Sequence, residues 1–196
     1  MFKFIAASVL AATSFTASAA VNLVQDGSFE SVLVGQGQWT TVGSTTGWTA
    51  TNGIEVRNDV AGQAFAGNNF AELDTNGNSS ISQTLSTVAG AAYQLSFWVQ
   101  DRGGDAAATD GISYTVNGVG GVPVAGGANA AWTEYSYAFV ATGASTVLTF
   151  NAAGNSDGYG SSLDNISVSA VPEANSLAML AAGLGLLGLA RRRARR

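Results

Sequence analysis

Polar and apolar side chains alternate along short segments between residues 21 and 170, and Gly and Asn separate these segments. A period of two is typical of strands that bury one face, and no segment in this range carries a helical stripe. The pattern therefore predicts an all-β fold. The predicted strands are 21–24, 28–32, 37–41, 54–57, 69–73, 79–86, 92–102, 111–117, 132–141, 145–152 and 161–169.

About ten strands in about 150 residues favour a sandwich of two sheets. Asn76-Gly77 and Asn117-Gly118 provide the residues of tight hairpin turns. The segment has the length of one ordinary domain that can bury its own core. We therefore expect one folded body at residues 21–170.

The C-terminal residues 171–196 have a composition of their own. Val171-Pro172-Glu173-Ala174 leads into an apolar run at 177–190, and five arginines follow it: Arg191, Arg192, Arg193, Arg195 and Arg196. A helix of this run is about 21 Å long, shorter than the roughly 30 Å hydrocarbon core, but arginines at its end extend their stems along lipid. We predict a short transmembrane helix whose arginines stay in the cytoplasm. A buried core helix is the alternative, and the terminal arginines disfavour it.

The N-terminal residues 1–20 have the features of a secretory signal peptide. Lys3 precedes an apolar run, and Ala17-Ser18-Ala19 provides small residues for cleavage. An N-terminal membrane anchor is the alternative, disfavoured by the short run. The chain thus divides into a signal peptide at 1–20, the β-sandwich at 21–170 and a C-terminal segment at 171–196.

Composition limits the chemistry of the body. The chain has no Cys and no His, which excludes disulfides, Ser-His-Asp and Cys-His nucleophiles and the usual zinc sites. Residues 21–170 contain two basic residues, Arg57 and Arg102, against twelve Asp and Glu, a net charge of −10. So acidic a body repels phosphate backbones and anionic lipid surfaces, and we expect neither nucleic acid nor peripheral membrane binding.

An aromatic residue on a strand face provides a candidate ligand platform. If Leu95, Phe97 and Val99 face the core, alternation places Trp98, Gln100 and Arg102 together on the opposite face. Glu55 and Arg57, on another strand, are candidates for the same surface. Such a face fits glycan recognition, which needs an aromatic surface and polar groups beside it. The alternative is that Trp98 packs under a loop.

The C-terminal segment resembles the PEP-CTERM sorting signal of Gram-negative bacteria, with Val171-Pro172-Glu173-Ala174 at the position of its Val-Pro-Glu-Pro box. The chain departs from the box at Ala174. The resemblance implies processing by signal peptidase and by an exosortase-type membrane protease. It also implies a location: anchored in the inner membrane with the body in the periplasm, then at the cell surface or in the extracellular matrix.

The body resembles the galactose-binding-like jelly-roll domains, which include many carbohydrate-binding modules. The segments that carry the resemblance are 22–30, Gly47-Trp48, 69–74, 80–85, 93–97, 132–139 and 163–168. It implies extracellular polysaccharide as a partner. It also implies a structural Ca²⁺ held by Glu30 and Asp164, to which Asp26 would add oxygen ligands. The alternative is a set of carboxylates that are solvated or hydrogen-bonded.

Three functions follow from these observations. The first is an exported, non-enzymatic protein that binds or associates with extracellular polysaccharide. The second is a structural protein of the biofilm matrix without a discrete ligand. The third, least favoured, is a glycan-active hydrolase, for which only Glu55, Glu72 and Asp74 are candidate carboxylates.

Overall fold

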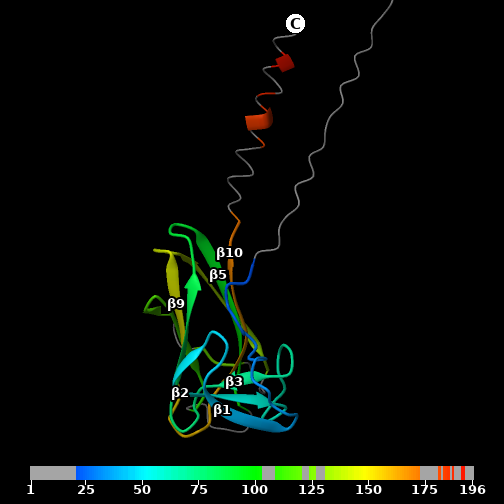
Figure 1. Ribbon diagram of the computed structural model, residues 1–196, viewed down its shortest axis with the longest axis vertical. Coiled ribbons are helices and arrows are strands. Elements are labelled where there is room, and N and C mark those ends of the chain that lie inside the picture. Colours follow the sequence, from blue (N-terminus) through cyan, green and yellow to red (C-terminus); the bar gives the residue numbers. More distant parts are fainter. Residues whose placement is uncertain are drawn as a thin grey trace, which may run out of the picture.

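The computed structural model describes residues 21–102, 109–120, 124–126 and 131–172, with 181, 183–185, 187, 191 and 192 of the C-terminal segment (Figure 1). The all-β prediction is confirmed. Its strands are β1 (Gln38–Ser44), β2 (Thr49–Asn58), β3 (Phe70–Glu72), β4 (Ser80–Ser86), β5 (Ala92–Gln100), β6 (Ile112–Val116), β7 (Val119–Gly120), β8 (Thr133–Val140), β9 (Ser145–Ala152) and β10 (Ser162–Ala170).

Several predicted features of the two chain ends lie outside the described residues. These are the signal peptide at 1–20, most of the apolar run at 177–190, and Glu173, Ala174, Arg193, Arg195 and Arg196. Within the part of the chain that the structure does describe, no helix is long and apolar enough to span a membrane.

The strands form one continuous hydrogen-bonded sheet in the order β7-β6-β9-β4-β2-β3-β10-β5-β8, with β1 paired to β2. The sequence predicted two separate sheets. The difference lies in β2, which is long enough to pair with two strands in succession. Ala50 near its start pairs with Ile81 of β4, and Val56 near its end pairs with Ala71 of β3.

This sheet curls around one core. In the sheet order, β5 and β9 are separated by four strands, yet the rings of Phe97 and Phe150 are 4.9 Å apart. Leu95, Phe97 and Val99 are each fully buried, as alternation along β5 predicts. Burial of each such side chain contributes about 1.5–3 kcal/mol, so the core stabilises the curl.

The predicted strands 21–24 and 28–32 are wrong. The segment turns instead, because Asp26 (φ 51°) and Phe29 (φ 58°) lie in the left-handed region, which extended strands do not adopt. Between them, a Cβ on Gly27 would come within 2.1 Å of the Ile166 carbonyl oxygen. The turn delivers Phe29 into the core, where it is fully buried.

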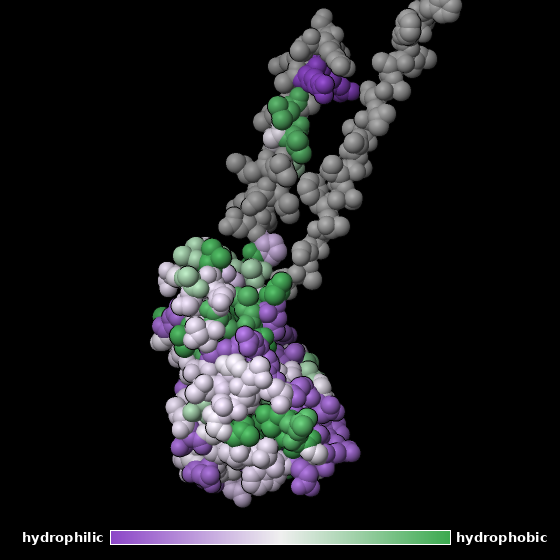
Figure 2. All heavy atoms as spheres, viewed as in Figure 1, coloured by the Kyte–Doolittle hydropathy of each residue, from purple (hydrophilic) through white to green (hydrophobic). Residues whose placement is uncertain are grey.

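The two ends of β10 define two ends of the body. At one end, the Val171 N–H donates to Ala92 O at 2.9 Å, and the Leu23 N–H donates to Val168 O at 2.8 Å, so both termini of the body leave from this tail end. At the other end Ser162 pairs with Glu72 and Gln100. Figure 2 shows apolar residues at the surface beside the exit of the C-terminal segment and in a second patch lower on the body.

Candidate functional site

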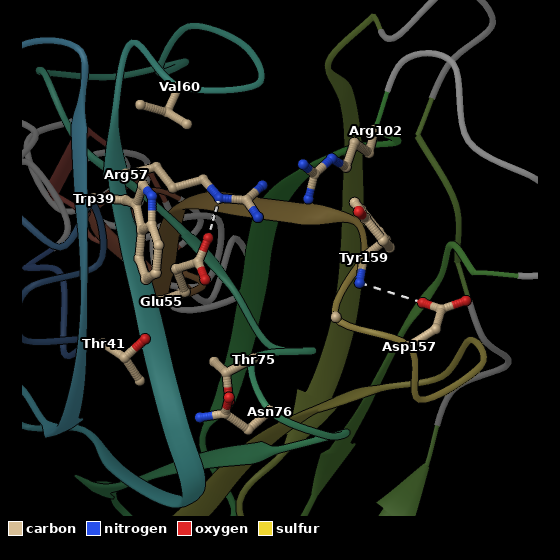
Figure 3. Close-up of a pocket in the computed structure, with 11 residues that line it drawn as sticks. Trp39, Thr41, Glu55, Arg57, Val60, Thr75, Asn76, Arg102, Asp157 and Tyr159 are labelled. Atoms are coloured by element: carbon tan, nitrogen blue, oxygen red, sulfur yellow. Dashed lines mark hydrogen bonds and ion pairs between the residues drawn. The ribbon is translucent and has the colours of Figure 1, made fainter.

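A pocket of about 440 Å³ opens at the end of the body opposite the tail end (Figure 3). Strands β1 and β2 form one wall, and two loops, at 74–76 and 157–159, form much of the other. Its lining residues are Trp39, Thr41, Glu55, Arg57, Val60, Thr75, Asn76, Arg102, Asp157, Gly158 and Tyr159.

The strand wall is set by cross-strand pairing. Trp39 pairs with Arg57 and Thr41 pairs with Glu55, so their side chains share one face of the sheet. On β2 the alternate residue Val56 is fully buried on the core face. Period-two alternation therefore places this wall's polar and aromatic groups toward the pocket.

Two exposed aromatic rings lie on opposite sides of the pocket, Trp39 on the strand wall and Tyr159 on the loop wall (Figure 3). Trp39 is 57% exposed and Tyr159 is 46% exposed. The guanidinium carbon of Arg102 lies 4.4 Å from the centre of the Tyr159 ring. This cation–π contact orients both side chains and leaves ring area open.

Arg57 lies between these walls and is 2% exposed. Its Nε donates to Glu55 Oε1 at 2.6 Å, and its Nη2 donates to Glu72 Oε2 at 2.5 Å. Its Nη1 is buried and has no hydrogen-bond partner in the structure. A buried N–H group without an acceptor costs about 1–3 kcal/mol, so an acceptor oxygen at this point would be stabilised.

Glu72 and Asp74 do not line the pocket but connect its two walls through hydrogen bonds. Glu72 Oε1 accepts the Asp74 N–H at 2.7 Å, and Asp74 Oδ2 accepts the N–H groups of Asp157 at 2.8 Å and Gly158 at 2.9 Å. Burial raises the pKa of Glu72 to about 7, although the Arg57 guanidinium lowers it. This hydrogen-bonded chain fixes the loop that carries Tyr159.

The structure brings together three of the five predicted ligand residues: Glu55, Arg57 and Arg102 all line the pocket. Trp98 does lie on the outer face of β5, but its ring stacks on Phe65 with centroids 3.7 Å apart. Gln100 is only 8% exposed. The alternative in which Trp98 packs under a loop describes this arrangement, and ligand binding at Trp98 stays a prediction.

The three predicted calcium ligands bind backbone and hydroxyl groups. Glu30 Oε1 accepts the N–H groups of residues 68 and 69, and Asp164 Oδ2 accepts those of residues 65 and 66, at 2.7 to 2.9 Å. Asp26 accepts the N–H and hydroxyl of Ser31. Among the described residues, no three acidic, His or Cys side chains form a group that could hold a metal. A calcium site at these residues stays an untested prediction.

Sequence reasoning missed the two aromatic residues of the pocket. Trp39 stands in a polar, Gly-rich segment. The pattern that could have indicated its direction is alternation along the strand, which places Trp39 and Thr41 on one face and Thr40 on the other. Tyr159 stands in a Gly-rich loop, where no periodicity indicates which way a side chain points. The pairing of β1 with β2 and the position of the loop are long-range features that the local pattern does not carry.

Comparison with known families agrees with the resemblance of the C-terminal segment to a sorting signal. The family DUF642, described as a protein of unknown function, matches residues 22–169, and the PEP-CTERM protein-sorting motif matches residues 170–196. No curated protein matches the chain.

Similar solved structures include carbohydrate-binding modules. One is the CBM22-1 xylan-binding domain of Xyn10C from Paenibacillus barcinonensis, with 22% identity, 81% of this chain and 100% of that chain covered, and a TM-score of 0.48. Another is TmCBM61 in complex with β-1,4-galactotriose, with 18% identity, 78% and 100% covered, and a TM-score of 0.49. A family 35 module from Clostridium thermocellum has 16% identity, 67% and 97% covered, and a TM-score of 0.45.

Proposed function

The chain belongs to the DUF642 family and ends in a PEP-CTERM protein-sorting motif, and from this premise we propose that it is an exported, surface-sorted protein that binds neutral glycan chains in its pocket. The sorting motif supports export and membrane-anchored sorting. It supports extracellular polysaccharide as the material that the body meets after processing.

The observation that carries the proposal is the pair of exposed rings that flank a polar pocket. Sugar rings present apolar C–H faces and polar hydroxyl edges, so a glycan site needs aromatic surface and hydrogen-bonding groups within one sugar's reach. Trp39 and Tyr159 offer the aromatic surface. The side chains of Thr41 and Asn76 offer donors, and the carboxylates of Glu55 and Asp157 offer acceptors.

The charges of the pocket favour a neutral ligand. Arg57 forms ion pairs with Glu55 and Glu72, and Asp157 also lines the pocket. These carboxylates balance the positive charge of Arg57. The body around it carries a net charge of −10, two basic residues against twelve acidic ones in 21–170. A polyanion approaching this surface is repelled, whereas a neutral polysaccharide is not.

The test is affinity electrophoresis of the full chain through gels containing soluble neutral polysaccharides, with Trp39→Ala and Tyr159→Ala as variants. We expect at least one polysaccharide to retard the parent and each variant to lose most of that retardation. Val147→Ala is the matched control, because Val147 is an apolar residue of similar exposure, 41%, that does not line the pocket. Equal retardation of parent and pocket variants would place binding elsewhere.

The other two functions make different predictions in the same experiment. A matrix protein without a discrete ligand gives no retardation by any soluble glycan. A hydrolase shortens the polysaccharide. Of its three candidate carboxylates only Glu55 lines the pocket, because Glu72 is fully buried and Asp74 is 1% exposed, and we therefore propose binding without catalysis.

A further inference from the structure

The tail end of the body is built from segments that are far apart in the chain. The Thr87 N–H donates to Ala144 O at 3.0 Å, the Gly90 N–H donates to Ala141 O at 2.8 Å, and the Val171 N–H donates to Ala92 O. These bonds gather the ends of strands β4, β8 and β10 with the starts of strands β5 and β9. The segments of the tail end are 21–23, 86–92, 140–147 and 170–172.

None of the residues in these four segments is charged. The body carries fourteen charged side chains in sequence, and none of those that the structure describes belongs to these four segments. At the opposite end, Glu55, Arg57 and Asp157 are among those that line the pocket. Among the described residues, the charged side chains are thus absent from the four segments of the tail end, and Glu173 follows them in the sequence.

The tail end also exposes apolar side chains. Val21 is 75% exposed, Val88 is 67% exposed, Val140 is 62% exposed and Val171 is 43% exposed. Scattered exposed apolar residues are normal, but four valines together on a surface without charge form an apolar face. Figure 2 shows apolar residues at this end of the body, beside the exit of the C-terminal segment.

We propose that the tail end is a docking surface for the lipid bilayer that holds the chain's own C-terminal segment. The apolar run begins at Leu177, five residues after Pro172. Five extended residues span at most about 18 Å, so the tail end cannot lie far from a membrane that receives this run. No other end of the body is held so close.

Charge makes this orientation favourable. Anionic lipids give a membrane surface a negative potential that decays over about 8 Å at physiological ionic strength. With the tail end against the bilayer, the carboxylates of the pocket end stand beyond this range. The reverse orientation would bring the carboxylates of Glu55 and Asp157 to the membrane and replace apolar contact by repulsion.

The experiment uses the absence of cysteine in the chain, which allows one label at a chosen position. The full chain is reconstituted in phosphatidylcholine vesicles with a fluorophore at Val88→Cys, Val140→Cys or Thr75→Cys, and quenchers are attached to the lipid headgroups. We expect quenching at 88 and 140 to be several-fold stronger than at 75, a residue that lines the pocket. A label at Leu184→Cys, within the apolar run, reports insertion, and no quenching there overturns the proposal.

A second arm of the experiment introduces negative charge on the tail end. Val88→Asp with Val140→Asp leaves the fold unchanged, because both side chains are largely exposed, and the melting temperature confirms this. Quenching of a label at residue 144 in that variant is expected to fall several-fold, most strongly when phosphatidylglycerol is added. Equal quenching at 75 and 88 overturns the proposal. So does a fluorescence signal between two labelled copies at residue 88 that persists on dilution in lipid, because it shows that a second copy covers the tail end.

Discussion

Arg57 and Glu72 form a buried ion pair, with Nη2 of the arginine 2.5 Å from Oε2 of the glutamate. Arg57 faces the pocket, and Glu72 lies behind it with no exposed surface. The pair therefore links the pocket to the hydrogen bonds that hold the loop at 157–159.

The stability of the protein should fall as pH rises from about 4 to about 7. Burial raises the pKa of Glu72 from 4.5 to about 7 and that of Asp164 from 3.8 to about 6. The folded state then holds more protons than the unfolded state in this range, so the free energy of unfolding decreases with pH and levels off above it. Urea unfolding at a series of pH values measures this slope. Glu72→Gln should flatten its upper part, whereas Asp157→Asn, at an exposed carboxylate, should not.

Asp74→Ala should weaken glycan binding although Asp74 does not line the pocket. Its carboxylate accepts the N–H groups of Asp157 and Gly158, which precede Tyr159. A hydrogen bond to a charged group contributes about 1.5–3 kcal/mol, so their loss should loosen this loop. Asp74→Asn keeps an acceptor oxygen and should retain more affinity. Retardation in affinity electrophoresis and the melting temperature are measured together. Equal affinity of Asp74→Ala and the parent would show that the loop needs no such support.

Trp98→Ala should cost stability and leave glycan binding unchanged. Trp98 stacks on Phe65 with an angle of 15° between the rings, and loss of a mostly covered indole is expected to cost about 2–4 kcal/mol. Thermal unfolding measures the loss. If Trp98→Ala instead unfolded like the parent and lost its retardation by glycan, the ligand site would lie on β5 and not at Trp39.

If Glu30 and Asp164 hold calcium, a chelator should lower the melting temperature. One oxygen of each carboxylate accepts backbone N–H groups from residues 65–69, and the other carboxylate oxygens would be the calcium ligands. A site bound at one hundred times its Kd would add about 2.7 kcal/mol to the free energy of unfolding. Thermal unfolding with calcium and with a chelator tests this. A rise in the presence of calcium that is absent from Glu30→Gln would establish a metal site.

Truncation after Pro172 should release a folded body. Among the described residues, the last backbone hydrogen bond at the C-terminal end of the body runs from Val171 to Ala92, and truncation after Pro172 keeps it. The truncated chain also lacks the apolar run at 177–190. Fractionation of cells should find it in soluble fractions with the melting temperature of the full-length body. Retention in membranes would show that the anchor lies elsewhere in the chain.

The sequence allowed the all-β class and most strand positions to be predicted, because alternation is a local property. Leu95, Phe97 and Val99 on β5 are buried as predicted. The turn at Asp26 and Phe29 could not be predicted, since it depends on the close approach of Gly27 to Ile166 from the other end of the chain.

Only part of the candidate site could be predicted from the sequence, for the same reason. Glu55 and Arg57 could be placed on one strand face from their spacing, and this face does line the pocket. Trp39 and Tyr159 could not be assigned to it, because one depends on strand pairing and the other on where a loop lies. Trp98 was placed on the correct face of β5, but its cover comes from Phe65, thirty-three positions earlier in the chain.

The position of β10 has a mechanical consequence. The C-terminal segment leaves from Ala170, the pocket lies near Ser162 at the other end of the same strand, and β10 is paired with β5 and β3. A pull between a bound glycan and an anchored tail would act along the axis of β10, across hydrogen bonds that run perpendicular to the strands. Those bonds would be loaded together in shear and would not be peeled apart one after another. We therefore expect the body to bear tension between a cell and its matrix without unfolding first at the strand that carries the load.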